Sequence, residues 1–254
     1  MGSISVSCLL VLSLLLHTAH ADDINVAVAS NFTAPMKEIA SLFEHASGHK
    51  VRLSFGASGK FYAQIKHGAP FHLFFSADQQ KPAQLEREEL IIPGSRFTYA
   101  VGQLALWSAQ EGFIKANPDR LLALQFNKLA IANPKLAPYG VAAIDVLEHL
   151  ALIDRTKSRW VHGENIAQTY QFVSTGNADL GFVALSQIMK EGRLKAGSSW
   201  IIPEALYTPI KQDAVLLRSG EHSPAAQALL RFMKTEQAEA IMQSYGYKPL
   251  ARTQ

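Results

Sequence analysis

The sequence predicts an α/β fold made of two lobes that are joined by two crossover segments. Strand-like and helix-like patterns alternate along the chain at a spacing typical of βαβ units with a parallel sheet. A second α/β unit follows the first, and two helical patterns near the end are expected to return to the first lobe. The predicted boundaries are residues 22–100 for the first part of lobe one, 101–210 for lobe two and 211–254 for the return to lobe one.

The first 21 residues have the pattern of a secretory signal peptide. An apolar run from Cys8 to Leu16 precedes Ala19-His20-Ala21, which matches an A-x-A cleavage site. The run is shorter than the roughly 20 residues that a membrane span needs. The prediction depends on these two features, because the segment contains no Lys or Arg. We therefore expect an exported protein of 254 − 21 = 233 residues that begins at Asp22 and contains neither disulfides nor a reactive thiol.

In the first lobe, apolar strand patterns alternate with amphipathic helix patterns. Met36, Ile39, Ala40 and Phe43 fall on one helical face, and Gly48 is expected to end that helix. The expected strands cover residues 24–30, 50–58 and 71–78, and the expected helices cover 34–48 and 60–68. Ligands of such sheets lie beyond the carboxyl ends of strands, against helix N-termini. The segments 29–31 and 56–59 occupy that position.

The second half repeats this alternation. The expected strands cover residues 104–107, 128–134 and 177–186, and the expected helices cover 139–153 and 164–176. An extended segment over 207–217 then precedes two further helices, 223–235 and 236–246. Ser223 as N-cap and Pro224 at the first helical position predict where the first of these helices begins.

The glycine-flanked turn in "SFGASGKFYAQI", Ser54 to Ile65, fails two enzyme motifs that it resembles. A phosphate-binding P-loop would need Gly at Ser54 and a hydroxyl at Phe61, and a hydrolase elbow would need Gly at Lys60. A small turn that opens a helix points unpaired N–H groups and the positive end of the helix dipole at whatever it holds. The pattern therefore favours a bound anion.

Other chemistry-bearing residues do not form a catalytic or metal-binding pattern. The net charge of +3 is mild and dispersed, which argues against nucleic acid as a partner. After residue 21, only His45 and His49 have i, i+4 spacing, and we interpret them as a solvated pair rather than as metal ligands. We expect Asp78, Asp145 and Asp179 to be caps and loop anchors, because no paired carboxylates suggest hydrolysis. The sequence thus predicts no catalytic residue, no cofactor and no protein-bound metal.

Five segments follow one another along the chain: "VAVASNFTAPMKEIASLFE", "LSFGASGKFYAQIKHGAPFHLFFSAD", "LAIANPKLAPYGVAAIDVLEHL", "NADLGFVALS" and "AEAIMQSYGY". Together and in this order they resemble the periplasmic molybdate-binding proteins of ABC transporters, and the similarity runs along nearly the whole chain after residue 21. The resemblance implies a type II periplasmic-binding-protein fold whose two lobes close on one tetrahedral oxyanion, molybdate or tungstate. It also implies a periplasmic, non-enzymatic protein, expected to be a monomer, that delivers the anion to an inner-membrane ABC permease.

The resemblance further implies which residues bind the oxyanion through neutral donors. The hydroxyl of the first loop matches Ser30, beside which Asn31 supplies a second polar group and a backbone N–H. The hydroxyl of the second loop matches Ser58. In lobe two, Tyr139 matches a tyrosine that some members use, and Ile166 matches a position that donates its backbone N–H.

Alternatives remain at the level of the sequence. Ser30, Asn31 and Ser58 fit ordinary helix caps, and Tyr139 fits a packing residue. Ala184 stands where some family members have a further tyrosine ligand, which leaves the donor set open and allows another oxyanion such as sulfate or chromate. An exported hydrolase is a more distant alternative, because it would need a nucleophile–base pair or a metal cluster.

Overall fold

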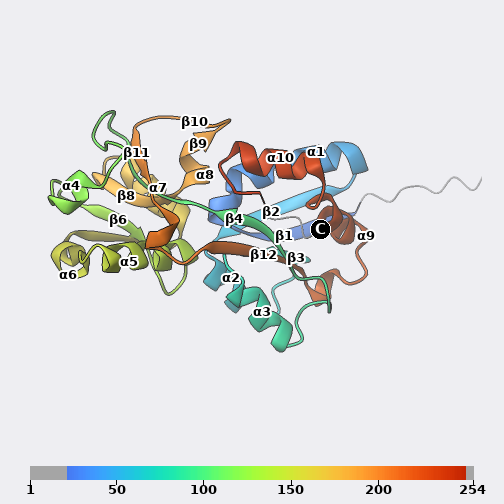
Figure 1. Ribbon diagram of the computed structural model, residues 1–254. Coiled ribbons are helices and arrows are strands. Elements are labelled where there is room, and N and C mark those ends of the chain that lie inside the picture. Colours follow the sequence, from blue (N-terminus) through green and yellow to red (C-terminus); the bar gives the residue numbers. More distant parts are fainter. Residues whose placement is uncertain (1–21, 250–254) are drawn as a thin grey trace, which may run out of the picture.

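The computed structural model describes residues 22–249, so the predicted signal peptide and its cleavage site lie outside the described residues. Within them the chain forms two α/β lobes, each built on a five-stranded sheet. Figure 1 shows the lobes side by side, with α4 to α8 in one and α1, α2, α3, α9 and α10 in the other.

The sheet of lobe one is mixed. β1 pairs in parallel with β2 and β3, while β12 is antiparallel to β3 and β4. In order across the sheet, the strands are β2 (Lys50–Gly56), β1 (Asp23–Ala29), β3 (Leu73–Phe75), β12 (Ile210–Leu216) and β4 (Phe97–Gly102). The alternating pattern predicted the parallel pairs, and the antiparallel strand β12 arises because the chain enters it from lobe two.

The sheet of lobe two has the same mixed plan. β6 pairs in parallel with β7 and β8, while β5 is antiparallel to β8 and to β11. In order, the strands are β11 (Ser198–Ile201), β5 (Leu104–Ser108), β8 (Leu180–Ala184), β6 (Leu129–Ala132) and β7 (Trp160–Gly163). A short hairpin of β9 (Met189–Lys190) and β10 (Arg193–Leu194) follows β8 and α8.

Helices cover both faces of each sheet. In lobe one these are α1 (Thr33–Ser47), α2 (Ser58–Lys66), α3 (Gln80–Arg87), α9 (Pro224–Phe232) and α10 (Glu236–Ser244). In lobe two they are α4 (Asp119–Leu122), α5 (Pro138–His149), α6 (Ile153–Thr156), α7 (Ile166–Ser174) and α8 (Leu185–Ile188). The described residues also form four short 3₁₀ helices, η1 (Ser30–Phe32), η2 (Lys157–Arg159), η3 (Glu204–Leu206) and η4 (Arg218–Gly220). Each lobe thus has two apolar layers, one on either face of its sheet.

The chain passes between the lobes twice within the described residues. Only Gln103 separates β4 of lobe one from β5 of lobe two, and residues 202–209 lead from β11 back to β12. Figure 1 shows β4 and β12 reaching toward lobe two through the middle of the molecule. These two segments are the crossovers that join the lobes.

Most predicted elements are confirmed, with small differences at their ends. The four α1 residues predicted to share a face are all buried, and α1 ends at Ser47 with Gly48 as its C-cap. The hydroxyl of Ser223 caps α9 by accepting a hydrogen bond from Ala226 N–H. The strands are shorter than their sequence patterns where they end in polar loops, so β3 covers only Leu73–Phe75. The sequence patterns did not predict α3, β4, β7 or β11.

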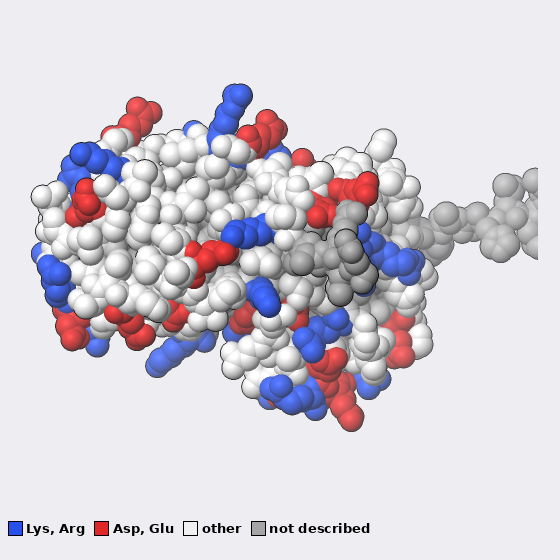
Figure 2. All heavy atoms as spheres, in the orientation of Figure 1, with Lys and Arg blue, Asp and Glu red and all other residues white. Residues whose placement is uncertain are grey.

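Charged side chains are interspersed on the face of the molecule shown in Figure 2, with no large area of one sign. No helix within residues 22–249 is long and apolar enough to span a bilayer.

Gly140 allows α5 to lie directly against the end of β6, and Gly140→Ala tests this contact. A Cβ at this position would lie 2.2 Å from the carbonyl oxygen of Ala132 and 2.9 Å from the nitrogen of Pro134. Helix propensity favours alanine by about 1 kcal/mol, but overlap with backbone atoms costs about 1–3 kcal/mol. We expect the steric effect to dominate and urea unfolding to show a lower free energy of unfolding. Val141→Ala, one residue away and 46% exposed, should change it by less than about 0.5 kcal/mol. A Gly140→Ala protein at least as stable as the wild type would contradict this account.

Candidate functional site

All five residues predicted to bind a ligand line one small cavity between the lobes. Ser30, Asn31 and Ser58 come from lobe one, and Tyr139 and Ile166 come from lobe two. The volume of the cavity is about 10 Å³. Pockets for drug-sized ligands have about 300–1,000 Å³. The cavity therefore suits a small ion or molecule.

Helix N-termini converge on this cavity from both lobes. Ser58 is the first residue of α2, Tyr139 is the second of α5, and Ile166 is the first of α7. The backbone N–H groups of these three residues have no acceptor among the described residues. Unpaired N–H groups and the positive ends of helix dipoles together favour an anion. This arrangement follows from the fold, because each of these helices follows the carboxyl end of a strand after a short loop: α2 follows β2, α5 follows β6 and α7 follows β7.

The serine hydroxyls are not ordinary helix caps. Neither α1 nor α2 has a side-chain cap hydrogen bond. Instead, Ser58 Oγ accepts a hydrogen bond from Ala77 N–H at 2.9 Å, and Ser30 Oγ donates to Asn165 Oδ1 across the lobes at 3.3 Å. Within the described residues Ser58 Oγ donates no hydrogen bond, so its proton is available to a molecule in the cavity.

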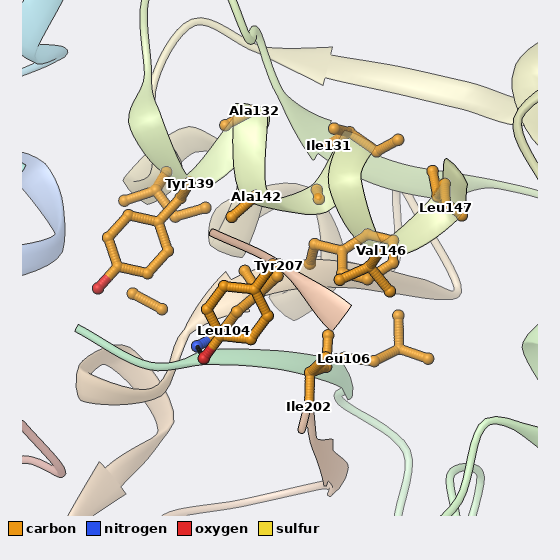
Figure 3. Packing of buried hydrophobic residues seen from close by; sticks show 14 of the residues in the cluster. Leu104, Leu106, Ile131, Ala132, Tyr139, Ala142, Val146, Leu147, Ile202 and Tyr207 are labelled. Atoms are coloured by element: carbon orange, nitrogen blue, oxygen red, sulfur yellow. Dashed lines mark hydrogen bonds between the residues drawn. The ribbon is translucent and has the colours of Figure 1, made fainter. Parts of the chain in front are cut away.

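Tyr139 is both a packing residue and part of a buried polar network. Its ring is 2% exposed and packs with Ala142 and other residues of the lobe-two core. Figure 3 shows this ring at the edge of the cluster, with the hydroxyl pointing out of it. The hydroxyl accepts a hydrogen bond from Gln212 Nε2 at 3.2 Å.

Gln212, a fully buried residue of β12, connects the two lobes behind the cavity. Its Oε1 accepts hydrogen bonds from Asn31 Nδ2 at 2.8 Å and from the hydroxyl of Tyr99 at 2.9 Å. Asn31 Nδ2 also donates to the hydroxyl of Tyr247 at 2.9 Å. Burial raises the pKa of Tyr99, Tyr139 and Tyr247 above the ordinary value of 10, so all three phenols keep their protons at neutral pH.

Asn31 carries an unusual buried atom. Its Oδ1 is the one buried side-chain nitrogen or oxygen without a partner in the part of the chain that the structure describes. Leaving such a group unpaired costs about 1–3 kcal/mol. A residue that lines the cavity therefore has hydrogen-bonding capacity that the surrounding protein does not use.

No charged side chain lines the cavity within the described residues. The three aspartates have the structural roles predicted for them. Asp78 Oδ1 accepts from Lys81 N–H, Asp145 Oδ2 accepts from Thr208 N–H, and Asp179 Oδ2 accepts from the N–H groups of residues 127 and 128. Among residues 22–249, no three His, Cys, Asp or Glu side chains lie close enough together to hold a metal ion.

Sequence reasoning missed two residues that organise the site. Asn165 caps α7, because its Oδ1 accepts from Ala167 N–H at 2.9 Å and from Gln168 N–H at 3.0 Å, and it also accepts from Ser30. An asparagine directly before a helical pattern is an N-cap signal, so Asn165 could have been found. Gln212 gave no signal, because it is a single polar residue within a strand.

Comparisons with known proteins agree with this geometry. A family model described as bacterial extracellular solute-binding protein matches residues 24–248. The molybdate-binding protein ModA of Azotobacter vinelandii is 54% identical over 234 residues, covering 92% of this chain and 93% of that protein. The molybdate-binding protein ModA of Rhodobacter capsulatus is 49% identical over 230 residues, covering 90% and 89%. The chain belongs to the ModA family of bacterial extracellular solute-binding proteins.

A solved structure supports the same assignment. The periplasmic molybdate-binding protein of Azotobacter vinelandii matches with a TM-score of 0.86 and 40% identity, covering 89% of this chain and 99% of that one. The family resemblance and the two-lobed periplasmic-binding-protein fold predicted from the sequence are thereby confirmed. Ala184, the position that the resemblance linked to a further tyrosine ligand, is fully buried at the end of β8 and is not among the residues that line the cavity.

Asn165 should contribute to stability through its cap. Asn165→Ala removes the acceptor of two backbone N–H groups, so we expect the free energy of unfolding to fall by about 0.5–2 kcal/mol. Asn165→Asp keeps a capping oxygen and should stay close to the wild type. Urea unfolding of the ligand-free protein measures both changes. Equal losses in the two variants would show that the cap is not what Asn165 contributes.

Proposed function

We propose that this protein binds molybdate, and also tungstate, in the periplasm and delivers it to an ABC-type permease of the inner membrane. The observation that carries the proposal is the convergence of helix N-termini from both lobes on a cavity lined by no charged residue. The ModA relatives support the choice of anion, since their names describe molybdate binding. These relatives are binding proteins of transport systems, and the proposed role involves no catalysis.

The proposed ligand contacts are neutral hydrogen bonds. Each hydrogen bond to a charged group contributes about 1.5–3 kcal/mol, so several donors can offset the loss of the anion's hydration. We assign the hydroxyl of Ser58 and the backbone N–H groups of Ser58, Tyr139 and Ile166 to this role. The hydroxyl of Ser30 would join them by turning its one proton from Asn165 Oδ1 to the anion. These donors do not titrate near neutral pH, and the backbone N–H groups among them offer no acceptor to a protonated anion.

Asn31 fits the same role if its amide turns. Its unpartnered Oδ1 would repel an anion, but a half-turn presents Nδ2 instead. When Gln212 turns with it, Gln212 Nε2 donates to Asn31 Oδ1 and Gln212 Oε1 accepts from the hydroxyl of Tyr139. The network then stays paired if the hydroxyl of Tyr247 donates to Asn31 Oδ1 and the hydroxyl of Tyr99 accepts from Gln212 Nε2. In this arrangement Tyr139 gives the anion its backbone N–H, while its hydroxyl supports Asn31.

We further propose that the lobes close around the anion. Residues 22–102 and 210–249 would move as one body and 104–201 as the other, bending at the two crossovers. An anion that contacts donors of both lobes stabilises the closed state relative to the open one. The proposal also includes removal of residues 1–21 on export and a monomeric protein that begins at Asp22.

A panel of oxyanions tests the proposed function. Molybdate at about 100 times its dissociation constant should add about 2.7 kcal/mol to the free energy of unfolding, which raises the melting temperature by roughly 5–10 °C. Sulfate and phosphate at the same concentration should cause little shift, because smaller tetrahedra cannot reach all the donors at once. Thermal unfolding and calorimetry measure both effects. A larger shift with sulfate than with molybdate would overturn the proposed cargo.

A single backbone donor is testable at Ile166. Proline is tolerated at the first position of a helix, and the preceding Asn165 has the extended conformation that proline requires (φ −147°, ψ 173°). Ile166→Pro should therefore keep α7 while removing one N–H from the anion. We expect a loss of molybdate affinity of roughly 10- to 150-fold by calorimetry.

Ile166→Ala is the matched control, because it also loses the isoleucine side chain but keeps the N–H. Its affinity should exceed that of Ile166→Pro by roughly tenfold or more. Equal affinities in the two variants would show that Ile166 N–H does not bind the anion.

A further inference from the structure

Two ion pairs among residues 22–249 join the lobes: Lys190 of β9 pairs with Glu38 of α1, and Lys60 pairs with Glu164 beside the proposed anion site. Lys60 Nζ lies 2.6 Å from Glu164 Oε2. Lys60 belongs to α2 of lobe one, two residues after Ser58, and Glu164 precedes α7 of lobe two by two residues, next to Asn165. The pair therefore connects the two helix N-termini that face each other across the cavity.

The main chain beside this pair also crosses the cleft. Gly59 N–H donates a hydrogen bond to the carbonyl oxygen of Leu136 in lobe two at 3.0 Å. A Cβ on Gly59 would lie 3.1 Å from that oxygen and 3.2 Å from Leu136 Cα. The loop of lobe two that contains Leu136 thus lies directly against the start of α2. The side chain of Lys60 extends from α2 at the edge of this contact.

Glu164 is held in position from its own lobe. Its backbone N–H donates to Gln168 Oε1 at 2.7 Å, within the first turn of α7. Neither Lys60 nor Glu164 forms another ion pair among residues 22–249. Both side chains are partly exposed, at 45% and 62%, so the pair lies at the rim of the site and not within it.

We propose that Lys60 and Glu164 form a latch that holds the lobes closed over the bound oxyanion and slows its release. The proposal rests on the proposed function, because it assumes an anion in this cavity. The latch makes no contact with the anion. It acts by favouring the closed arrangement in which Gly59 meets Leu136, so its loss should appear mainly in the dissociation rate.

Charge substitutions distinguish an ion pair that holds the lobes together from a direct long-range attraction or repulsion between each side chain and the anion, which we call a field effect. A latch requires opposite charges, so Lys60→Glu and Glu164→Lys should each raise the dissociation rate constant of molybdate, by about two- to fivefold. A field effect alone predicts opposite signs, because Glu164→Lys would add positive charge near a dianion and slow its release. The double variant Lys60→Glu with Glu164→Lys restores an oppositely charged pair and should return the rate to within about twofold of the wild type.

The control is another ion pair of the same helix. Lys66 Nζ lies 2.8 Å from Glu88 Oε1, and both residues belong to lobe one, so this pair does not cross the cleft. The corresponding variants at Lys66 and Glu88 should leave the dissociation rate within about twofold of the wild type. Stopped-flow displacement of molybdate by excess tungstate, followed through tryptophan fluorescence or an attached dye, gives the rates.

The outcomes distinguish the latch from the proposed function. If the wild-type protein binds molybdate but Glu164→Lys leaves release unchanged or slower, the latch is wrong and the proposed function stands. If the Lys66 and Glu88 variants accelerate release as much as the Lys60 and Glu164 variants, the effect is not specific to the cleft and the latch is also wrong. If the wild type binds none of the oxyanions, both are wrong.

Discussion

The constraint that the proposed function places on this structure is the burial of a charge without a counter-charge. A cavity that holds a dianion with neutral groups must offer donors and exclude acceptors, because an acceptor facing the anion would add repulsion to the cost of desolvation. Backbone N–H groups at helix starts meet this requirement, since each helix directs its carbonyl groups away from its N-terminus. Placing α2, α5 and α7 around one cavity then requires two sheets whose strand ends face each other, which is the two-lobed fold observed.

The same constraint explains the polar network behind the cavity. Buried amides and phenols are stabilising only when their groups are paired, and here Gln212 joins Asn31 and Tyr99 of lobe one to Tyr139 of lobe two. Gln212 belongs to β12, which directly follows a crossover, so the hydrogen bonds that orient the site lie beside the place where we propose that the lobes bend. Under this proposal, Gln212 links the closure of the lobes to the orientation of the groups that donate hydrogen bonds to the anion.

The sequence predicted those features that depend on local residue patterns and on their order along the chain, namely the main strands and helices and the turn at Ser58. Alternating apolar runs located the main strands and helices, and the small residues around Ser58 indicated a turn that favours an anion. The sequence could not predict contacts between residues far apart in the chain. Ser58 Oγ binds Ala77 N–H and Gln212 binds Asn31 over 181 positions, and neither partner carries a local signal. Short strands such as β7 and β11 were missed because four residues do not establish a period.

In the proposed function, closure by the protein's own contacts sets a balance between capture and release. The bonds from Gly59 N–H to Leu136 and from the Ser186 hydroxyl to the carbonyl oxygen of Asn31 join the lobes with no contribution from a ligand, so part of the free energy of the closed state is supplied by the protein. Each such contact reduces the free energy that the anion must supply to close the cleft, and it also raises the barrier to opening. Weak, solvent-exposed contacts at the rim suit this balance, because an ion pair of about 0–1 kcal/mol biases closure without making it irreversible. A protein that must release its cargo would be impaired by a tightly packed, apolar interface in the same place.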